Sequence, residues 1–217
     1  MWSVRESEHV REDWPTSPPP PWPATVRATL WWHRAAPAAS AFGPGGRVLP
    51  VTLAMMVDYL DSPVGPYREI LASPVLRAPS RVVGALPAMA VPFIAVDSAA
   101  SVHGGREHWS LPKVLADFEG DVTGTGAAVG DGWRVETTAH PFGPRLPIVG
   151  ALGFAQPLPD GGLANARAWL RGRFRVARVE VGATGPTLGD WMLPGVHPGI
   201  VIESGVMRTG PARLARR

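Results

Sequence analysis

Short apolar runs separated by turn residues make up most of this chain, which has 25 glycines and 25 prolines in 217 residues. Runs of this kind are typical of antiparallel β-structure. Helical patterns are confined to two short segments, residues 98–109 and 163–171. The pattern predicts a mainly β (α+β) domain with few short helices, arranged as an antiparallel β-barrel or cone. We expect strands over residues 25–34, 48–60, 67–72, 82–85, 91–96, 114–118, 121–127, 133–139, 146–154, 174–181 and 199–208.

The N-terminal segment has a different composition from the rest of the chain. Charged residues there are followed by the sequence TSPPPPWP. Proline restricts the backbone to extended conformations and donates no backbone hydrogen bond, so such a run joins neither a helix nor a sheet. We therefore expect residues 1–23 to form a proline-rich arm and residues 24–217 to form one domain.

The basic residues are almost all arginine. The chain has a formal net charge of +3, and Lys113 is the only lysine among its 21 lysine and arginine residues. The arginines are spread along the chain without an accompanying aromatic stacking motif, which argues against nucleic-acid binding. A composition biased toward arginine explains the shortage of lysine. On that explanation the surviving lysine is chance; the alternative interpretation is that it marks a place where arginine cannot serve, because only lysine can readily become a neutral, nucleophilic amine.

Several other kinds of site are excluded. The chain has no cysteine, so it has no disulfide and no thiolate. His103, His108 and His140 show no metal-ligand spacing with a third ligand. Ser110 lacks the G-x-S-x-G context of a serine hydrolase, and the glycine-rich residues 120–132 fit a hairpin turn better than a phosphate loop. We expect no metal and no organic cofactor.

The sequence also indicates where the protein works. No run of 18 apolar residues is present, which argues against a membrane-spanning helix. The scattered acids near the N-terminus do not fit a secretory signal. We therefore expect a cytoplasmic protein.

Two segments contain the candidate chemistry. In the sequence GREHWSLPKVLA, residues 105–116, a short helix or turn leads through Leu-Pro to Lys113, which we expect to open a strand. In DSPVGPYRE, residues 61–69, a turn leads to Glu69. Arg27 lies where the ordered domain should begin. Each also has an ordinary structural explanation: Lys113 as a surface charge, Glu69 as a solvated strand end and Arg27 as a structural cation.

The first segment resembles the lysine motif of the acetoacetate decarboxylase family, in which a Gly-Arg-Glu run leads through an aromatic residue and proline to a Schiff-base lysine. The second is similar to the glutamate-bearing segment of that family, and the likeness covers roughly residues 24–210. It implies an acetoacetate decarboxylase-like barrel or cone that assembles as a homo-oligomer. It further implies that Lys113 forms the imine, that Glu69 is a pocket glutamate, and that Arg27 binds the carboxylate of a small keto acid.

Two departures from the family pattern leave the reaction open. The second lysine of the family is replaced here by Val114, and an ungapped count places Ala54 where the family has another pocket glutamate. A protonated imine acts as an electron sink, so the same intermediate supports decarboxylation, aldol chemistry or dehydration. Decarboxylation of an acetoacetate-like acid is our first interpretation, with an aldolase or dehydratase next. A small-ligand-binding protein with an inactive site is the alternative from a different class.

The expected chemistry sets a physical requirement on Lys113. An amine attacks a ketone only when it is unprotonated, and burial in apolar surroundings favours the neutral form. With valine in place of the second lysine, we expect desolvation to be the main means of activation. Glu69 is suited to proton transfer within such a site.

Overall fold

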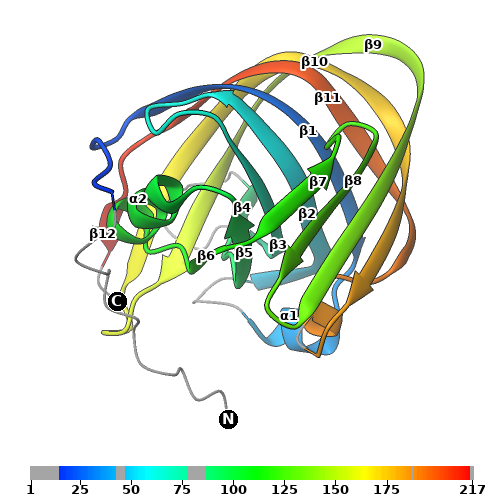
Figure 1. Cartoon of the computed structure of the whole chain (residues 1–217). Coiled ribbons are helices and arrows are strands. Elements are labelled where there is room, and N and C mark those ends of the chain that lie inside the picture. Colours follow the sequence, from blue (N-terminus) through cyan, green and yellow to red (C-terminus); the bar gives the residue numbers. More distant parts are fainter. Residues whose placement is uncertain (1–14, 43–46, 78–86, 187, 216–217) are drawn as a thin grey trace.

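The protein is described by a computed structural model covering residues 15–42, 47–77, 87–186 and 188–215. Strands dominate it, with two α-helices and one short 3-10 helix in these ranges (Figure 1). The elements are β1 (Trp22–Arg34), α1 (Pro37–Ala41), β2 (Arg47–Asp61), β3 (Tyr67–Arg77), β4 (Pro87–Met89), β5 (Phe93–Val96), α2 (Ala99–Trp109), β6 (Lys113–Leu115), β7 (Asp117–Gly120), β8 (Thr125–Gly130), β9 (Trp133–Pro157), β10 (Leu163–Thr184), η1 (Leu188–Asp190), β11 (Gly195–Thr209) and β12 (Arg213–Ala215).

The long strands are joined into one strongly curved sheet that wraps around the core (Figure 1). Antiparallel pairing runs in the order β9, β10, β11, β1, β2, β3 and β4. The circuit returns to β9 through a short parallel contact that pairs Ala88 with Gly153 and Met89 with Phe154. This confirms the mainly β architecture with few short helices, and it shows two parallel pairings, β4–β9 and β5–β6, within an otherwise antiparallel sheet.

Some of the secondary-structure predictions are confirmed and others are wrong. The helix predicted over residues 98–109 is confirmed as α2. The helix predicted over residues 163–171 is wrong, because this segment is the first part of β10, which pairs with both β9 and β11. The strands predicted over residues 133–139 and 146–154 are one continuous strand, β9. The strand predicted over residues 82–85 lies outside the described residues.

The first strand begins earlier than predicted. β1 begins at Trp22, within the segment that the sequence assigns to the arm, and Trp22 is buried. The Oγ of Ser17 lies 2.9 Å from Nδ1 of His103 and 3.2 Å from Nε2 of His108, so this part of the segment contacts α2.

No helix among the described residues is both long enough and apolar enough to cross a membrane.

Strands β2 and β3 are covered on both faces, and this arrangement creates two separate cores. Alternate residues of a strand point to opposite faces. Met56 and Ile70 point to one face, where they pack with Trp31 and with residues of β8, β9 and β10. Tyr59 and Tyr67 point to the other face, which packs beneath α2. This second face contains the candidate site.

Helix α2 is defined at both ends and is unusual in its interior. Its N-cap residue, Ser98, accepts a hydrogen bond from the backbone of Ser101, and its C-cap, Ser110, has left-handed backbone geometry with a φ of 55°. Two glycines lie inside it although glycine weakens helices by about 1 kcal/mol relative to alanine. A Cβ at Gly104 would lie 2.3 Å from the Trp22 ring, and one at Gly105 would lie 2.5 Å from Cδ of Lys113. Close packing therefore explains both glycines.

The larger core provides a test of the fold. Trp31 is fully buried, whereas its neighbour Trp32 points to the other face and is 38% exposed. We expect Trp31→Ala to lower the free energy of unfolding by about 3–5 kcal/mol, and Trp32→Ala to lower it by about 1 kcal/mol. Urea unfolding followed by circular dichroism measures both. Equal losses in the two variants would contradict the described orientation of β1.

Candidate active site

The site is centred on a contact between two buried, ionisable side chains. Nζ of Lys113 donates a hydrogen bond to Oε2 of Glu69 at 2.6 Å. The two residues are only 3% and 4% exposed. Lysine and glutamate are almost never buried to this degree unless they are paired. The structure therefore brings together two of the three residues that the sequence proposes, and it places them inside the protein.

Three further side chains complete a buried polar cluster. Nζ of Lys113 also donates to Oγ of Ser101 at 2.9 Å, and it lies 5.2 Å from the centre of the Tyr67 ring. The hydroxyl of Tyr59 donates to Oε1 of Glu69 at 3.2 Å. The rings of Tyr59 and Tyr67 stack with their centres 4.2 Å apart. Each oxygen of the carboxylate thus has its own donor, which fixes the orientation of Glu69.

Strand register explains how distant segments meet here. Tyr67 and Glu69 are two residues apart on β3 and so share a face, and Tyr59 of β2 is paired directly with Tyr67. β5 lies next to β3 and carries β6 on its other side, with Ile94 paired to Lys113. The prediction that Lys113 opens a strand is confirmed.

The chain is also held in place just before Lys113. After Ser110 ends α2, the backbone of Leu111 donates to the carbonyl of Gly105. Nε of Arg106 donates to the backbone carbonyl of Lys113 at 2.9 Å. Helix and strand are therefore tied together on both sides of Pro112, and the lysine side chain lies against the glycine surface of α2.

The two tyrosines have strongly perturbed acidities. Burial raises the pKa of Tyr59 well above its ordinary value, and the nearby charge of Glu69 raises it further. Burial also raises the pKa of Tyr67 well above its ordinary value, again with a contribution from Glu69. Both phenols therefore stay neutral at physiological pH, and the Tyr59 hydroxyl remains a hydrogen-bond donor to Glu69.

Lys113 and Glu69 lie at the wall of a small cavity with a volume of about 90 Å³. Most of its wall is apolar, and Lys113 and Glu69 are the only charged residues among the described ones that form it. It is lined by Trp22, Ala24, Met55, Tyr59, Ser62, Tyr67, Glu69, Leu71, Met89, Ile94, Trp109, Leu111, Lys113, Leu152, Phe154, Ala168, Met207 and Thr209. Such a cavity suits a small, largely apolar molecule whose reactive group meets the lysine.

The positions that depart from the family motif lie away from this cavity. Val114 follows Lys113 but is 40% exposed and does not line the cavity. Ala54 is fully buried in the other core, beside Met56 and Ala72.

Among the described residues, no three His, Asp or Glu side chains lie close enough together to hold a metal ion.

Arg27 is not part of the cluster. Its Nε donates to Oδ2 of Asp58 at 2.9 Å, and it lies 3.5 Å from the carboxylate of Asp121. Asp58 and Tyr59 are consecutive in β2, so Arg27 and Asp58 are on the face opposite to Tyr59 and Glu69. Arg27 is also absent from the described lining of the cavity. The role in carboxylate binding that the family resemblance implies for it has no support from this geometry.

Solved structures of other proteins share this architecture. A structure from structural studies of acetoacetate decarboxylase has a TM-score of 0.63 and 14% identity, covering 93% of this chain and 91% of that chain. An acetoacetate decarboxylase from Legionella pneumophila has a TM-score of 0.65 and 13% identity, covering 93% and 90%. The chain has the acetoacetate decarboxylase-like fold.

The same fold is found in a protein of different description. The enduracididine biosynthesis enzyme MppR, solved with bound HEPES buffer, has a TM-score of 0.64 and 16% identity over 91% of this chain and 88% of that chain. No family model and no curated protein matches the sequence. Since all these identities are low, the likeness establishes the acetoacetate decarboxylase-like fold, and the chemistry must be argued from the site.

Three residues of the cluster are not among the sequence predictions. Tyr67 carries a signal, because it stands two positions before Glu69 in a predicted strand and so must share its face. No local sequence signal marks Tyr59 or Ser101 as part of the cluster. Their contacts depend on the register of β2 with β3 and on the packing of α2.

The tyrosines allow the cluster to be tested directly, since they are the only two in the chain. Because both pKa values are raised in the folded state, we expect no phenolate absorbance from the native protein near pH 10, the ordinary value. The unfolded tyrosines ionise there, so the tyrosine contribution to stability is fully present below about pH 10 and is lost as the pH rises further.

Alkaline titration with parallel unfolding curves measures this effect. The free energy of unfolding should fall by about 1.4 kcal/mol per pH unit for each tyrosine above pH 10. Tyr59→Phe should halve the phenolate signal that appears when the protein unfolds. Normal titration of both tyrosines in a still-folded protein would contradict the described burial.

Proposed function

We propose that this protein is an imine-forming lyase that decarboxylates a small keto acid through Lys113. The observation that carries the proposal is a buried lysine amine, paired with a carboxylate, at the wall of an apolar cavity. The acetoacetate decarboxylase-like fold adds support, because the solved acetoacetate decarboxylases share this architecture.

The pairing with Glu69 provides a route to the reactive amine. A buried ion pair suffers a large desolvation penalty, whereas two neutral partners do not. When the proton moves from the Lys113 ammonium to the Glu69 carboxylate along their hydrogen bond of 2.6 Å, both groups become neutral. The amine then has a free electron pair, and Glu69 holds a proton for later use. The hydrogen bond from Tyr59 keeps the carboxyl group in place throughout.

The reaction then follows from ordinary imine chemistry. The nitrogen adds to the keto carbon, and the carbonyl oxygen leaves as water. The bond between the carboxylate and its neighbouring carbon breaks, its electron pair enters the iminium system, and CO2 leaves. The departing water takes one proton from the nitrogen and one from Glu69, so Glu69 takes up a proton from solvent before it protonates the resulting enamine carbon. Water hydrolyses the imine, which releases a ketone and restores the amine.

The composition of the cavity favours decarboxylation over the alternatives. Lys113 is the only cation among the described lining residues, so a substrate carboxylate has no second cation to pair with once the imine has formed. An unpaired carboxylate in apolar surroundings is costly, and its loss as neutral CO2 removes that cost. In an aldolase or dehydratase reaction the substrate retains its carboxylate, which then needs a cation in the cavity to pair with throughout the reaction.

Borohydride trapping tests the proposal. Incubation with acetoacetate and sodium borohydride should fix an adduct on Lys113, because only an imine is reduced to a stable amine. Mass spectrometry should find the adduct of acetone, formed after CO2 loss, and headspace analysis should detect released CO2. Trapping with pyruvate and an aldehyde in parallel tests the aldolase alternative.

Lys113→Arg is the control, because it removes the only lysine while retaining the charge. This variant should lose both the adduct and any CO2 release. Failure to trap an adduct on wild-type Lys113 with any keto acid would leave a binding protein as the better interpretation. An adduct that still contains the carboxylate, with no CO2 release, would contradict decarboxylation while retaining the imine.

The packing of α2 against the lysine gives a second prediction. Gly105→Ala should raise helix propensity by about 1 kcal/mol. Its new Cβ would lie 2.5 Å from Cδ of Lys113, so the lysine side chain must shift. A displacement of about 1 Å can cost roughly 100-fold in rate, and we expect CO2 release to fall by about that factor with folding intact.

Gly150→Ala is the matched control, since nothing lies within 4 Å of a Cβ at that position. It should retain the wild-type rate of CO2 release. If Gly105→Ala also retained that rate while folding normally, the contact between α2 and Lys113 would have no part in positioning the amine.

A further inference from the structure

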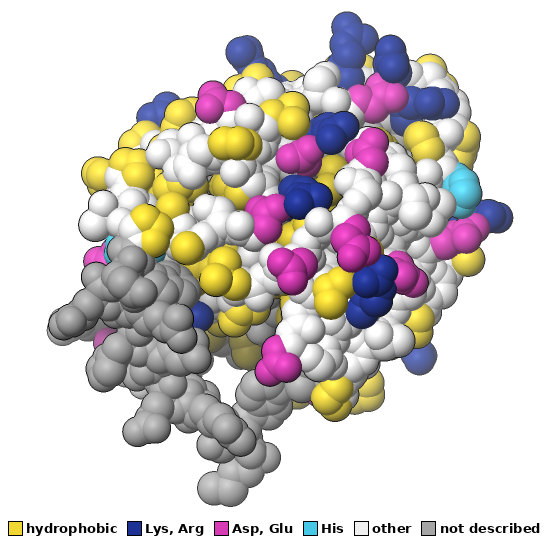
Figure 2. All heavy atoms as spheres, viewed as in Figure 1, with side chains coloured by type: hydrophobic (Ala, Val, Ile, Leu, Met, Phe, Trp, Pro, Cys, Tyr) yellow, Lys and Arg dark blue, Asp and Glu magenta, His cyan; other side chains and the backbone are white. Residues whose placement is uncertain are grey.

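The directions of the hydrogen bonds at the Lys113 nitrogen are set by the protein. On the face of the molecule in Figure 2, acidic and basic side chains are mixed at the surface, where water can bind them. Lys113 is only 3% exposed. Among the described residues its acceptors are Oε2 of Glu69 at 2.6 Å and Oγ of Ser101 at 2.9 Å. An ammonium group has three donor directions, so these two contacts leave one.

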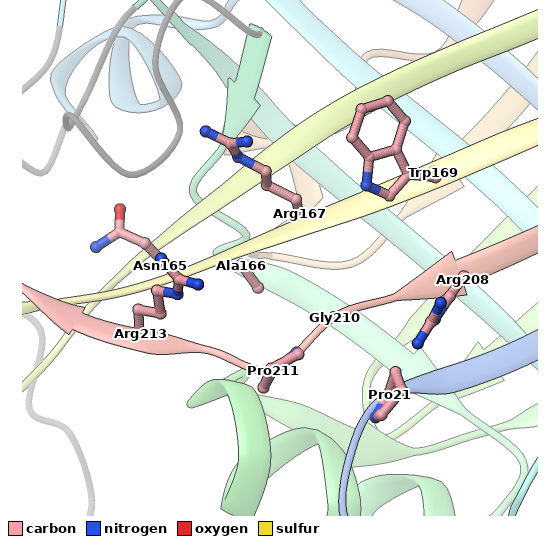
Figure 3. Close-up of a pocket in the computed structure, with 9 residues that line it drawn as sticks. All are labelled: Pro21, Asn165, Ala166, Arg167, Trp169, Arg208, Gly210, Pro211 and Arg213. Carbon is pink, nitrogen blue, oxygen red and sulfur yellow. The ribbon is translucent and has the colours of Figure 1, made fainter.

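The remaining direction matters because a substrate approaches the nitrogen through the active-site cavity. Lys113 lines this cavity, whereas Ser101 is absent from its described lining. A larger hollow of about 390 Å³ lies on the other face of the sheet, where Trp169 lines it (Figure 3), and the adjacent Ala168 lines the cavity. Successive side chains of a strand point to opposite faces, so the sheet separates the two spaces. The outer hollow therefore gives no route to the amine.

Helix α2 holds Ser101 in a defined place beside the nitrogen. Ser101 is fully buried in the first turn of α2, where its backbone N–H donates to Oγ of Ser98. Gly105 is four residues later and so lies on the same face of the helix. A Cβ at Gly105 would lie 2.8 Å from Cε of Lys113. The helix thus contacts the lysine at two points, the stem through Gly105 and the nitrogen through Ser101.

The Ser101 hydroxyl also has a partner for its own hydrogen. Burial is the main cause of the raised pKa of Tyr67, and a hydrogen bond from Ser101 to the Tyr67 oxygen opposes it. A serine hydroxyl has only one hydrogen to donate. With that hydrogen directed to Tyr67, the Ser101 oxygen accepts from the Lys113 nitrogen in both its charged and its neutral form.

We propose that Ser101 is a positioning residue that directs the electron pair of the Lys113 amine into the cavity. When Lys113 passes a proton to Glu69, the electron pair first points at Glu69. Staggered positions about the Cε–Nζ bond are about 120° apart. One step of rotation therefore brings the electron pair to the cavity and leaves one hydrogen on Ser101 and one on Glu69, since a protonated carboxyl group still accepts a hydrogen bond.

Without the Ser101 hydroxyl, the electron pair can also point at α2 while a hydrogen points into the cavity, and this arrangement cannot attack a ketone. The proposal rests on the proposed function, because it concerns the amine that forms the imine.

Carbamylation of Lys113 by cyanate tests the orientation without requiring turnover. The electron pair of a neutral amine bonds to the carbon of isocyanic acid, and one proton moves from the amine to the isocyanate nitrogen. Lys113 is the only lysine, so mass spectrometry of its peptide measures the rate, with the α-amino group of the same chain as an internal reference. Where the rate no longer rises with pH, Ser101→Ala should react about tenfold more slowly at Lys113.

The pH dependence separates positioning from a general structural role. Ser101 accepts a hydrogen bond from the charged amine, so its loss should move the rise of the rate with pH to lower pH. Ser73→Ala is the matched control, because Ser73 is equally buried but donates to the carbonyl of Pro74 and does not line the cavity. It should match the wild type in rate and in pH dependence, and Ser101→Thr, which retains the hydroxyl, should recover most of the rate.

Acetoacetate turnover then distinguishes this inference from the proposed function. Ser101→Ala should lower kcat for CO2 release about tenfold and leave KM unchanged, since Ser101 does not line the described cavity. Slower carbamylation of this variant, with no CO2 release from the wild type, would support the positioning role and contradict the decarboxylase. Wild-type CO2 release with equal carbamylation rates in Ser101→Ala and the wild type would overturn the positioning role alone, as would equal slowing in Ser73→Ala or an unreactive wild-type Lys113.

Discussion

A single buried contact, between the amine of Lys113 and the carboxylate of Glu69, sets the demands on the surrounding structure. Two ionisable groups taken out of water are tolerated only where geometry and hydrogen bonds compensate the desolvation. The compensation here comes from Ser101 on the amine and Tyr59 on the carboxylate. The strands β2, β3, β5 and β6 and the helix α2 all contribute to holding these few atoms together.

The curved sheet makes this contact possible because it buries both faces of β2 and β3. One face packs in the larger core around Met56 and Ile70, which holds the two strands in place. The other face is then free to present Tyr59, Tyr67 and Glu69 to a small cavity closed by α2. The glycines of α2 let the helix approach closely enough to pack on Trp22 and on the lysine stem. Close packing on one face thus positions the side chains of the candidate site on the other.

Local sequence signals predict the centre of the site but not its surroundings. The Leu-Pro step before Lys113 and the turn before Glu69 mark a helix-to-strand junction and a strand start, and both are confirmed. The helix predicted over residues 163–171 fails because its alanines and arginines alternate in burial, and pairing with β9 and β11 overrides helix propensity. Arg27 pairs with Asp58 because the register of β1 with β2 places these two residues opposite each other. No local sequence pattern predicts that register. The homo-oligomer and the cytoplasmic location stay predictions.

The central claim is that the Lys113 nitrogen replaces the carbonyl oxygen of a small ketone. Exchange of isotopically labelled oxygen between acetone and water tests this step alone, because every imine formed and hydrolysed swaps the oxygen, whether or not CO2 is ever lost. The account predicts exchange well above the background rate with the wild type, and background exchange with Lys113→Arg. Background exchange with the wild-type protein, or undiminished exchange without the lysine, would contradict it.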